Sequence, residues 1–285
     1  MSAAGATVGH DTRRLWLALG LSVVALLLLS ALWAPPYLST PDPALAGAGP
    51  LELLPFGADD RGVPLVEYAL QGAAILTVPA LAAGGLVMVL AALAGLLRCT
   101  GGGRLHGALD VGVHVGAELV SALPRWVVVL VVALMLPRDA HSLLPIALVW
   151  ALLAAPGAMD EAAAAAERLG GERFVEALHA HGFSWSRIYL GHVVARNLRP
   201  VLVRQGAEVS LQVVYLELAL SYLAVTRQQP SWTHPDSQHS WASLLYQGYA
   251  ALLGHPTQHV LVLALGLVGV VVVGFQALRL AARGR

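Results

Sequence analysis

The sequence has 285 residues, of which 57% are hydrophobic and only 12% charged, and its mean hydropathy is +0.69. Ordinary soluble domains carry roughly 25% charged residues, so this composition excludes a soluble globular enzyme. Seventeen arginines balance seventeen acidic residues, which excludes the strongly basic surface typical of nucleic-acid-binding proteins. The single cysteine excludes an internal disulfide.

Six apolar stretches predict an all-α integral membrane protein with six transmembrane helices. The first stretch, Leu15 to Trp33, is charge-free and nineteen residues long, enough to cross a hydrocarbon core of roughly 30 Å. A signal peptide has a shorter apolar core and a small-residue cleavage site, so an uncleaved anchor is expected. The predicted spans are 15–33, 68–97, 111–136, 140–159, 205–225 and 260–278.

The connecting segments predict the orientation of the chain in the membrane. With residues 1–14 in the cytoplasm, thirteen arginines lie in cytoplasmic segments and three in outer ones. Basic residues near span ends are retained in the cytoplasm, so both termini and the segment 160–204 are predicted to be cytoplasmic. The segments 34–67, which is rich in proline, and 226–259 are then outer loops.

Charged residues interrupt the third and fifth predicted spans, where a charge costs a few kcal/mol unless it is paired or faces water. Glu118 and Arg125 are seven residues apart, which places them on one face of a continuous helix that should contact protein. Glu208 is expected to pair with Arg204 at the i, i+4 spacing. Glu217 either lines a pathway or subunit interface or bonds to a neighbouring helix.

The segment 160–204 contains an amphipathic run followed by a glycine that can end a helix with positive φ, and then by two aromatic residues expected to be exposed. A projecting helix-turn-helix with aromatic residues at its tip suits docking into a groove of a soluble partner. A helix on the membrane surface would have the same pattern. The residues of this candidate docking loop are Glu176, Ala177, Gly182, Phe183, Trp185 and His192.

This loop resembles that of the permease subunits of bacterial ATP-binding-cassette importers, in the branch for dipeptides, oligopeptides and nickel. The family pattern is E-A-A, three residues, Gly, nine residues, and then an apolar residue or His. Glu176 begins the pattern here, Gly182 is in register, and His192 lies ten residues beyond it. Leu178 replaces the second alanine, and Ala195 stands where the branch typically has proline.

Five further blocks resemble the same family in the same order along the chain. They are Pro55 to Asp59 with Gly62, Ala122-Leu123-Pro124, Pro156-Gly157, Glu217 to Leu223, and Ser240-Trp241-Ala242. Val63-Pro64 departs from the charged pair of the first block. The resemblance implies the type I importer permease fold in the bacterial inner membrane and assigns Glu217, Ser221 and Tyr222 as candidates for the pathway or the interface between permeases.

The resemblance implies a non-catalytic subunit with four kinds of partner: a second homologous permease, two cytoplasmic ATPase subunits, an extracytoplasmic substrate-binding protein and the lipid membrane. The chain has no G-x-x-x-x-G-K-[ST] motif, so ATP and Mg²⁺ are expected to bind the partners. The histidines of 226–259 have only weak metal-ligand spacing, and no metal is expected. Trp241 is expected to anchor the membrane interface. The alternatives are a permease-like scaffold without transport and, with no catalytic arrangement to support it, an intramembrane enzyme.

Overall fold

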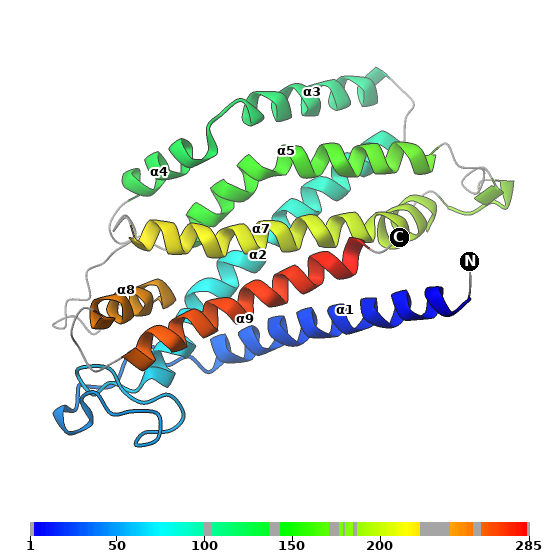
Figure 1. The fold of residues 1–285 in the computed structure, drawn as a ribbon. Coiled ribbons are helices and arrows are strands. Elements are labelled where there is room, and N and C mark those ends of the chain that lie inside the picture. Colours follow the sequence, from blue (N-terminus) through cyan, green and yellow to red (C-terminus); the bar gives the residue numbers. More distant parts are fainter. Residues whose placement is uncertain are drawn as a thin grey trace.

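The computed structural model describes residues 3–99, 104–136, 143–170, 177–178, 180–184, 187–222, 240–252 and 258–283. These residues form a helical bundle, with one isolated β-bridge between Ala58 and Pro64 and no β-strand among them (Figure 1). The expected all-α architecture is therefore confirmed.

Four helices of the described residues are long and apolar enough to cross a membrane, and a fifth span results if one bent helix pair is counted. The candidate spans are Asp11–Leu32, Leu65–Arg98, Leu143–Leu169 and Gln258–Ala282. They belong to the helices α1 (Ala3–Leu32), α2 (Leu65–Cys99), α5 (Leu143–Gly170) and α9 (Gln258–Arg283). Helix α5 continues past the predicted end of its span, so the first part of the segment 160–204 is helical.

The predicted fifth span corresponds to helix α7 (Arg199–Tyr222), which is not one of the four candidate spans. This helix carries Arg204, Glu208 and Glu217, and these charges lower its hydropathy. A shorter helix, α8 (Trp241–Leu252), precedes α9. The 3-10 turn η1 (Pro43–Leu45) lies in the loop after α1, and the π-helix η3 (Arg187–Leu198) leads into α7.

The predicted third span is broken. Helix α3 (Arg104–Ser121) and helix α4 (Arg125–Met135) are separated by three residues, and the segments 111–121 and 125–135 meet at a bend of 81°. Pro124 caps α4, and proline disfavours helical backbone in the residue before it, which explains the break. Glu118 and Arg125 therefore do not share the face of one helix, and the Glu118 side chain is 70% exposed. The expectation of one continuous helix with both residues on one face was therefore wrong, whereas their contact with protein stays a prediction.

Helix α2 is the centre of the bundle and packs most extensively against α5 and α7. Small residues allow α2 and α7 to approach closely: a Cβ added to Gly84 would lie 2.7 Å from the Gly206 carbonyl oxygen. Ser210 on α7 donates a hydrogen bond of 2.9 Å to the Ala80 carbonyl of α2. Close packing of glycine faces with an interhelical hydrogen bond is the usual way in which helices associate in lipid.

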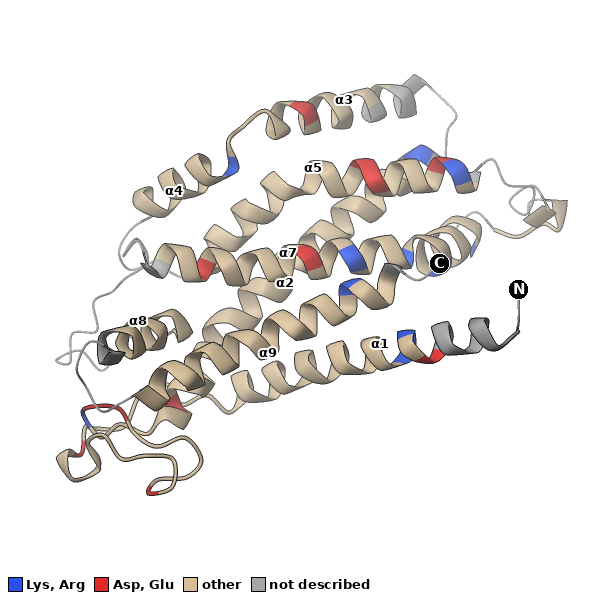
Figure 2. Cartoon of the chain, viewed as in Figure 1, with Lys and Arg blue, Asp and Glu red and all other residues tan. Residues whose placement is uncertain are grey.

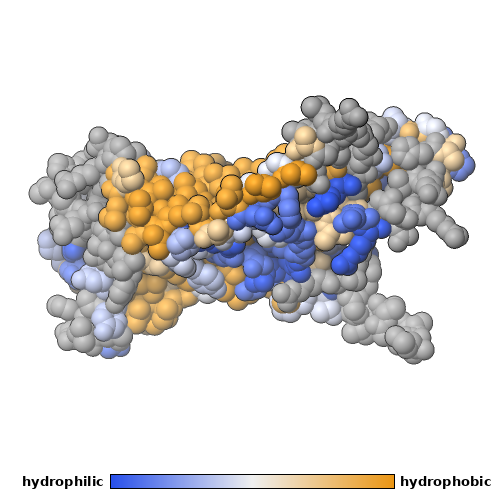
Figure 3. Space-filling model, turned by 90° about the horizontal axis from the view of Figure 1, so that it is seen from above, coloured by the Kyte–Doolittle hydropathy of each residue, from blue (hydrophilic) through white to orange (hydrophobic). Residues whose placement is uncertain are grey.

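The two ends of the bundle differ in charge. The first turns of α1 and the last turns of α9 lie at one end, called here the terminal end, and α8 and the loop 34–64 lie at the other (Figure 1). Most of the coloured arginines lie in the half nearer the terminal end (Figure 2). On the face in Figure 3, hydrophobic residues cover the half nearer α8, and hydrophilic residues gather toward the terminal end. This charge distribution agrees with the predicted arginine asymmetry. The assignment of the terminal end to the cytoplasmic side of the membrane stays a prediction.

Candidate functional site

The turn around Gly182 lies at the terminal end of the bundle, between α5 and η3 (Figure 1). Residues 177, 178 and 180 are helical, and Gly182 ends this helix with a φ of 74°. The Phe183 amide donates to the Leu178 carbonyl at 3.2 Å, the long hydrogen bond of a Schellman cap. The expected helix end with positive φ is therefore confirmed at this glycine.

Phe183 is half-buried rather than exposed. It packs against the hydrophobic core of the bundle, and the guanidinium carbon of Arg187 lies 4.8 Å from its ring centroid. The His192 ring meets it edge-on with centroids 6.5 Å apart. The expectation that this aromatic side chain is exposed was wrong, because the Arg187 guanidinium lies over its ring and the side chain packs against the core.

The π-helix η3 attaches the turn to the bundle. Ile188, Val193 and Leu198 are all fully buried, and they are spaced by five residues. A π-helix has more residues per turn than an α-helix, so side chains five apart diverge less and all three can lie on the side that packs against the bundle. That element packs against α2, α5 and α7. The turn at Gly182 is thus mechanically connected to the centre of the bundle.

Two ion pairs join three helices at the same level of the bundle. Arg204 and Gln205 on α7 both contact the carboxylate of Glu161 on α5. Glu208 on α7 pairs with Arg279 on α9 at 3.1 Å. The expected pair between Glu208 and Arg204 does not form, because each side chain has a partner on a neighbouring helix.

The block Pro55 to Asp59 lies in the loop 34–64, which precedes α2. The carboxylate of Asp59 is buried and accepts hydrogen bonds from the Arg61 amide at 3.0 Å, the Val63 amide at 2.8 Å and the Tyr68 hydroxyl at 2.8 Å. Gly62 has a φ of 85°, and an added Cβ would collide with the backbone carbonyl of Asp42. This block therefore folds the loop 34–64 onto the start of α2.

Trp241 does not anchor the membrane interface as expected. Its side chain is 4% exposed, its ring packs where Gly72 lacks a Cβ, and its Nε1 donates to the Ala69 carbonyl at 3.0 Å. The block Ser240-Trp241-Ala242 thus attaches α8 to α2.

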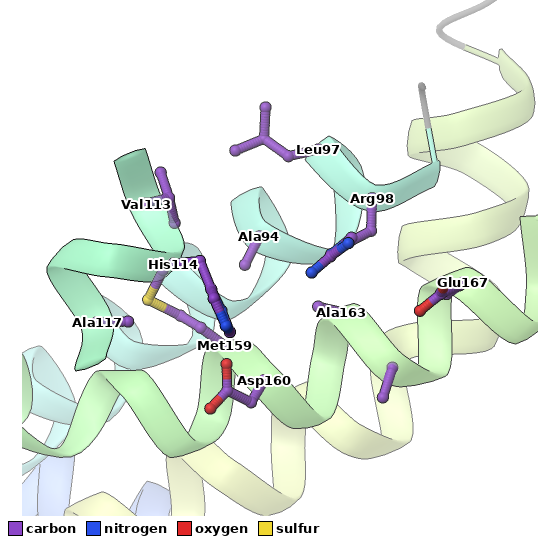
Figure 4. Close-up of a pocket in the computed structure, with 11 residues that line it drawn as sticks. Ala94, Leu97, Arg98, Val113, His114, Ala117, Met159, Asp160, Ala163 and Glu167 are labelled. Atoms are coloured by element: carbon purple, nitrogen blue, oxygen red, sulfur yellow. The ribbon is translucent and has the colours of Figure 1, made fainter. Parts of the chain in front are cut away.

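A cavity of about 230 Å³ lies between α2, α3 and α5 (Figure 4). Its lining includes Arg98, His114, Asp160 and Glu167. The close-up shows the side chains of His114 and Asp160 pointing toward one another across the opening. The charges of its lining are therefore mixed, which gives no preference for an ion of either sign.

The structure brings Gly182, Phe183 and His192 of the candidate docking loop together, and Ala177 lies exposed beside them. Glu176 and Trp185 lie outside the described residues, as do the histidines of 226–239 and His255. Glu217 is buried within α7, with 6% of its surface exposed. Ser221 and Tyr222 form the end of α7, and their side chains also lie outside the described part. In the part of the chain described, no cluster of three metal-ligating side chains occurs.

No protein-family model matches the sequence, and no curated protein matches it at a significant level.

Proposed function

We propose that the chain is the permease subunit of an ATP-binding-cassette importer. In this role it forms half of a pathway for peptides or a related small solute and pairs with a second permease. Two cytoplasmic ATPase subunits bind ATP with Mg²⁺ and dock on the loops of the two permeases, and an extracytoplasmic binding protein delivers the solute. The resemblance of six ordered sequence blocks supports this role, together with four helices long and apolar enough to cross a membrane.

The observation that carries the proposal is the connection from α5 through the Gly182 turn to η3 and α7. The turn lies at the end of the bundle where the arginines gather (Figure 2). Ala180, His181, Gly182 and Ser184 are exposed, which leaves backbone and side chains accessible to a soluble partner. A docking surface outside the candidate spans, at the arginine-rich end, is what an ATPase partner requires.

The same connection can transmit motion from a docked ATPase to the bundle. A displacement of the Gly182 turn acts on Phe183, which packs against the core, and on the buried face of η3. From η3 it reaches α7, which is joined to α5 through Arg204 and Glu161. Packed cores respond to such displacements by rigid-body shifts of helices rather than by continuous deformation. In the proposed role these shifts open the pathway alternately to the two sides.

The first test is affinity purification of the tagged chain from its native membrane, followed by identification of the co-purified proteins. We expect an ATP-binding-cassette ATPase and a second permease. Replacing Gly182 with Trp strains the positive-φ turn and should remove the ATPase from the complex. The matched control is Gly191→Trp on η3, a glycine with open space around an added Cβ and no positive φ, and this variant should retain the ATPase.

The second candidate function is a membrane scaffold that resembles a permease without transporting. The half-buried Phe183, held under Arg187, is the observation that favours it, because an ATPase groove receives less apolar surface from this turn. The same purification separates the two functions. A complex without any ATPase subunit, obtained from the wild-type chain, would contradict the importer and favour the scaffold.

A further inference from the structure

A cavity of about 490 Å³ lies at the terminal end, between α1 and α9 on one side and the junction of η3 with α7 on the other. Its volume falls within the range of roughly 300–1,000 Å³ that is typical of small-molecule sites. Arg13, Arg196 and Arg199 line it, and none of its lining residues is acidic. It therefore differs from the cavity in Figure 4, whose lining mixes both signs of charge, and it favours an anion.

The three arginines reach the cavity from different elements. The Nε of Arg13 donates to the Ala281 carbonyl at 2.8 Å, which fixes this side chain against the last turn of α9. Arg196 near the end of η3 and Arg199 at the start of α7 are exposed and three residues apart. Guanidinium groups bind phosphate oxygens through paired N–H donors, so this cluster suits a phosphate ester.

Apart from Asn197, the rest of the lining is apolar, and part of it lies further along the candidate span of α1. Leu17 and Leu21 of α1 line the cavity and are 39% and 53% exposed. Arg13 lies in the first turn of the candidate span Asp11–Leu32. At 1.5 Å per residue, Leu17 and Leu21 are therefore about 6 and 12 Å further along the helix. The cationic part of the cavity is thus at the membrane boundary and its apolar part in the hydrocarbon.

We propose that this cavity binds an anionic phospholipid, with its phosphate held by Arg13, Arg196 and Arg199 and an acyl chain along Leu17 and Leu21. Basic pockets between transmembrane helices near the membrane surface bind anionic headgroups in this way. A soluble phosphate ester would use the arginines but leave the apolar wall without a contact. The inference depends on the apolar helices and not on the importer function.

The test uses the full-length chain in nanodiscs of phosphatidylcholine alone or of an equimolar mixture with phosphatidylglycerol, with bound lipid detected by native mass spectrometry. The wild-type chain should retain phosphatidylglycerol after detergent washing. Arg196→Gln/Arg199→Gln should bind it at least about tenfold more weakly than the control Arg14→Gln/Arg168→Gln. Both variants lose two arginines, and the control residues are exposed and do not line the cavity. Equal retention by the two variants would overturn the proposal.

A second comparison separates the lipid from a soluble ligand. Leu17→Ser/Leu21→Ser should lose phosphatidylglycerol without changing the binding of glycerol 3-phosphate, which contacts only the arginines in this arrangement. If the serine variant retains the lipid, or if glycerol 3-phosphate displaces the lipid at comparable concentration, the site is one for soluble phosphate and the lipid proposal fails. Loss of a co-purified protein from the arginine variant, with lipid retained, would likewise contradict it.

Discussion

Replacing Asp59 with Ala should loosen the loop between α1 and α2 far more than the same change at Asp60. Asp59 is 1% exposed and its carboxylate accepts three hydrogen bonds, whereas the side chain of Asp60 is 61% exposed. Alanine leaves the Val63 amide and the Tyr68 hydroxyl without their acceptor. Both of these bonds are buried.

The magnitude follows from the cost of a buried donor that loses its acceptor, about 1 to 3 kcal/mol for each neutral group. Two such donors give about 4 kcal/mol, which is roughly a thousandfold increase in the population of the opened loop. Asp59→Asn keeps the shape, and its carbonyl oxygen still accepts from the backbone amides. Its amide can donate to the Tyr68 hydroxyl, so we expect a cost of only about 1 kcal/mol.

Hydrogen–deuterium exchange of the segment 57–65, followed by mass spectrometry in detergent, measures this opening directly. The expected order of exchange rates is Asp59→Ala far above Asp59→Asn, and Asp60→Ala close to the wild-type protein. If Asp59→Ala exchanges no faster than Asp60→Ala, the buried carboxylate does not stabilise the loop and the reasoning is refuted. Cleavage by trypsin after Arg61 gives a second readout for the wild type and the two Asp59 variants.

Two further predictions concern the packing of α7. Gly84→Ala should lower the thermal unfolding midpoint relative to Gly85→Ala by the equivalent of about 2 kcal/mol. An added Cβ would lie 2.3 Å from Ser210 Oγ at position 84, whereas it meets open space at position 85. Equal midpoints would show that α2 and α7 are not in close contact at Gly84. A double-mutant cycle with alanine at Glu208 and Arg279 should give a coupling of about 1 kcal/mol, as expected for a partly exposed pair. The cycle for Glu208 and Arg204 should give a coupling near zero, and the reverse result would restore the pairing that the sequence predicts.

Local signals predicted most of the helices correctly. Charge-free apolar runs located α1, α2, α5 and α9, and the glycine at the end of an amphipathic run located the positive-φ cap at Gly182. The break at Pro124 had a signal as well, since a proline within a predicted span marks a probable helix boundary. It was missed because apolar residues continue on both sides of the break. Hydropathy indicates whether a segment lies in water or in an apolar environment, and it carries no information on the direction of the backbone.

Contacts between helices could not be predicted in the same way. Glu208 has an arginine four residues away on its own helix, yet it pairs with Arg279, which is distant in sequence. The choice depends on how α7 and α9 are rotated against each other, and no periodicity in either helix contains that information. The contact between Trp241 and Gly72 is a similar case. Neither residue has a sequence signal that predicts the contact, and the absence of a Cβ at Gly72 on α2 makes room for the Trp241 indole of α8.

The burial pattern of η3 depends on the period of its helix. An α-helix turns about 100° per residue, so side chains five apart diverge by about 140°, and Ile188, Val193 and Leu198 could not all face the core. A π-helix has more residues per turn, so side chains five apart diverge less, and all three are buried in η3. The spacing of these apolar residues thus favours the π-helix over the α-helix in this segment. Since the same segment carries the motion of the Gly182 turn in the proposed mechanism, its period bears on function as well as on fold.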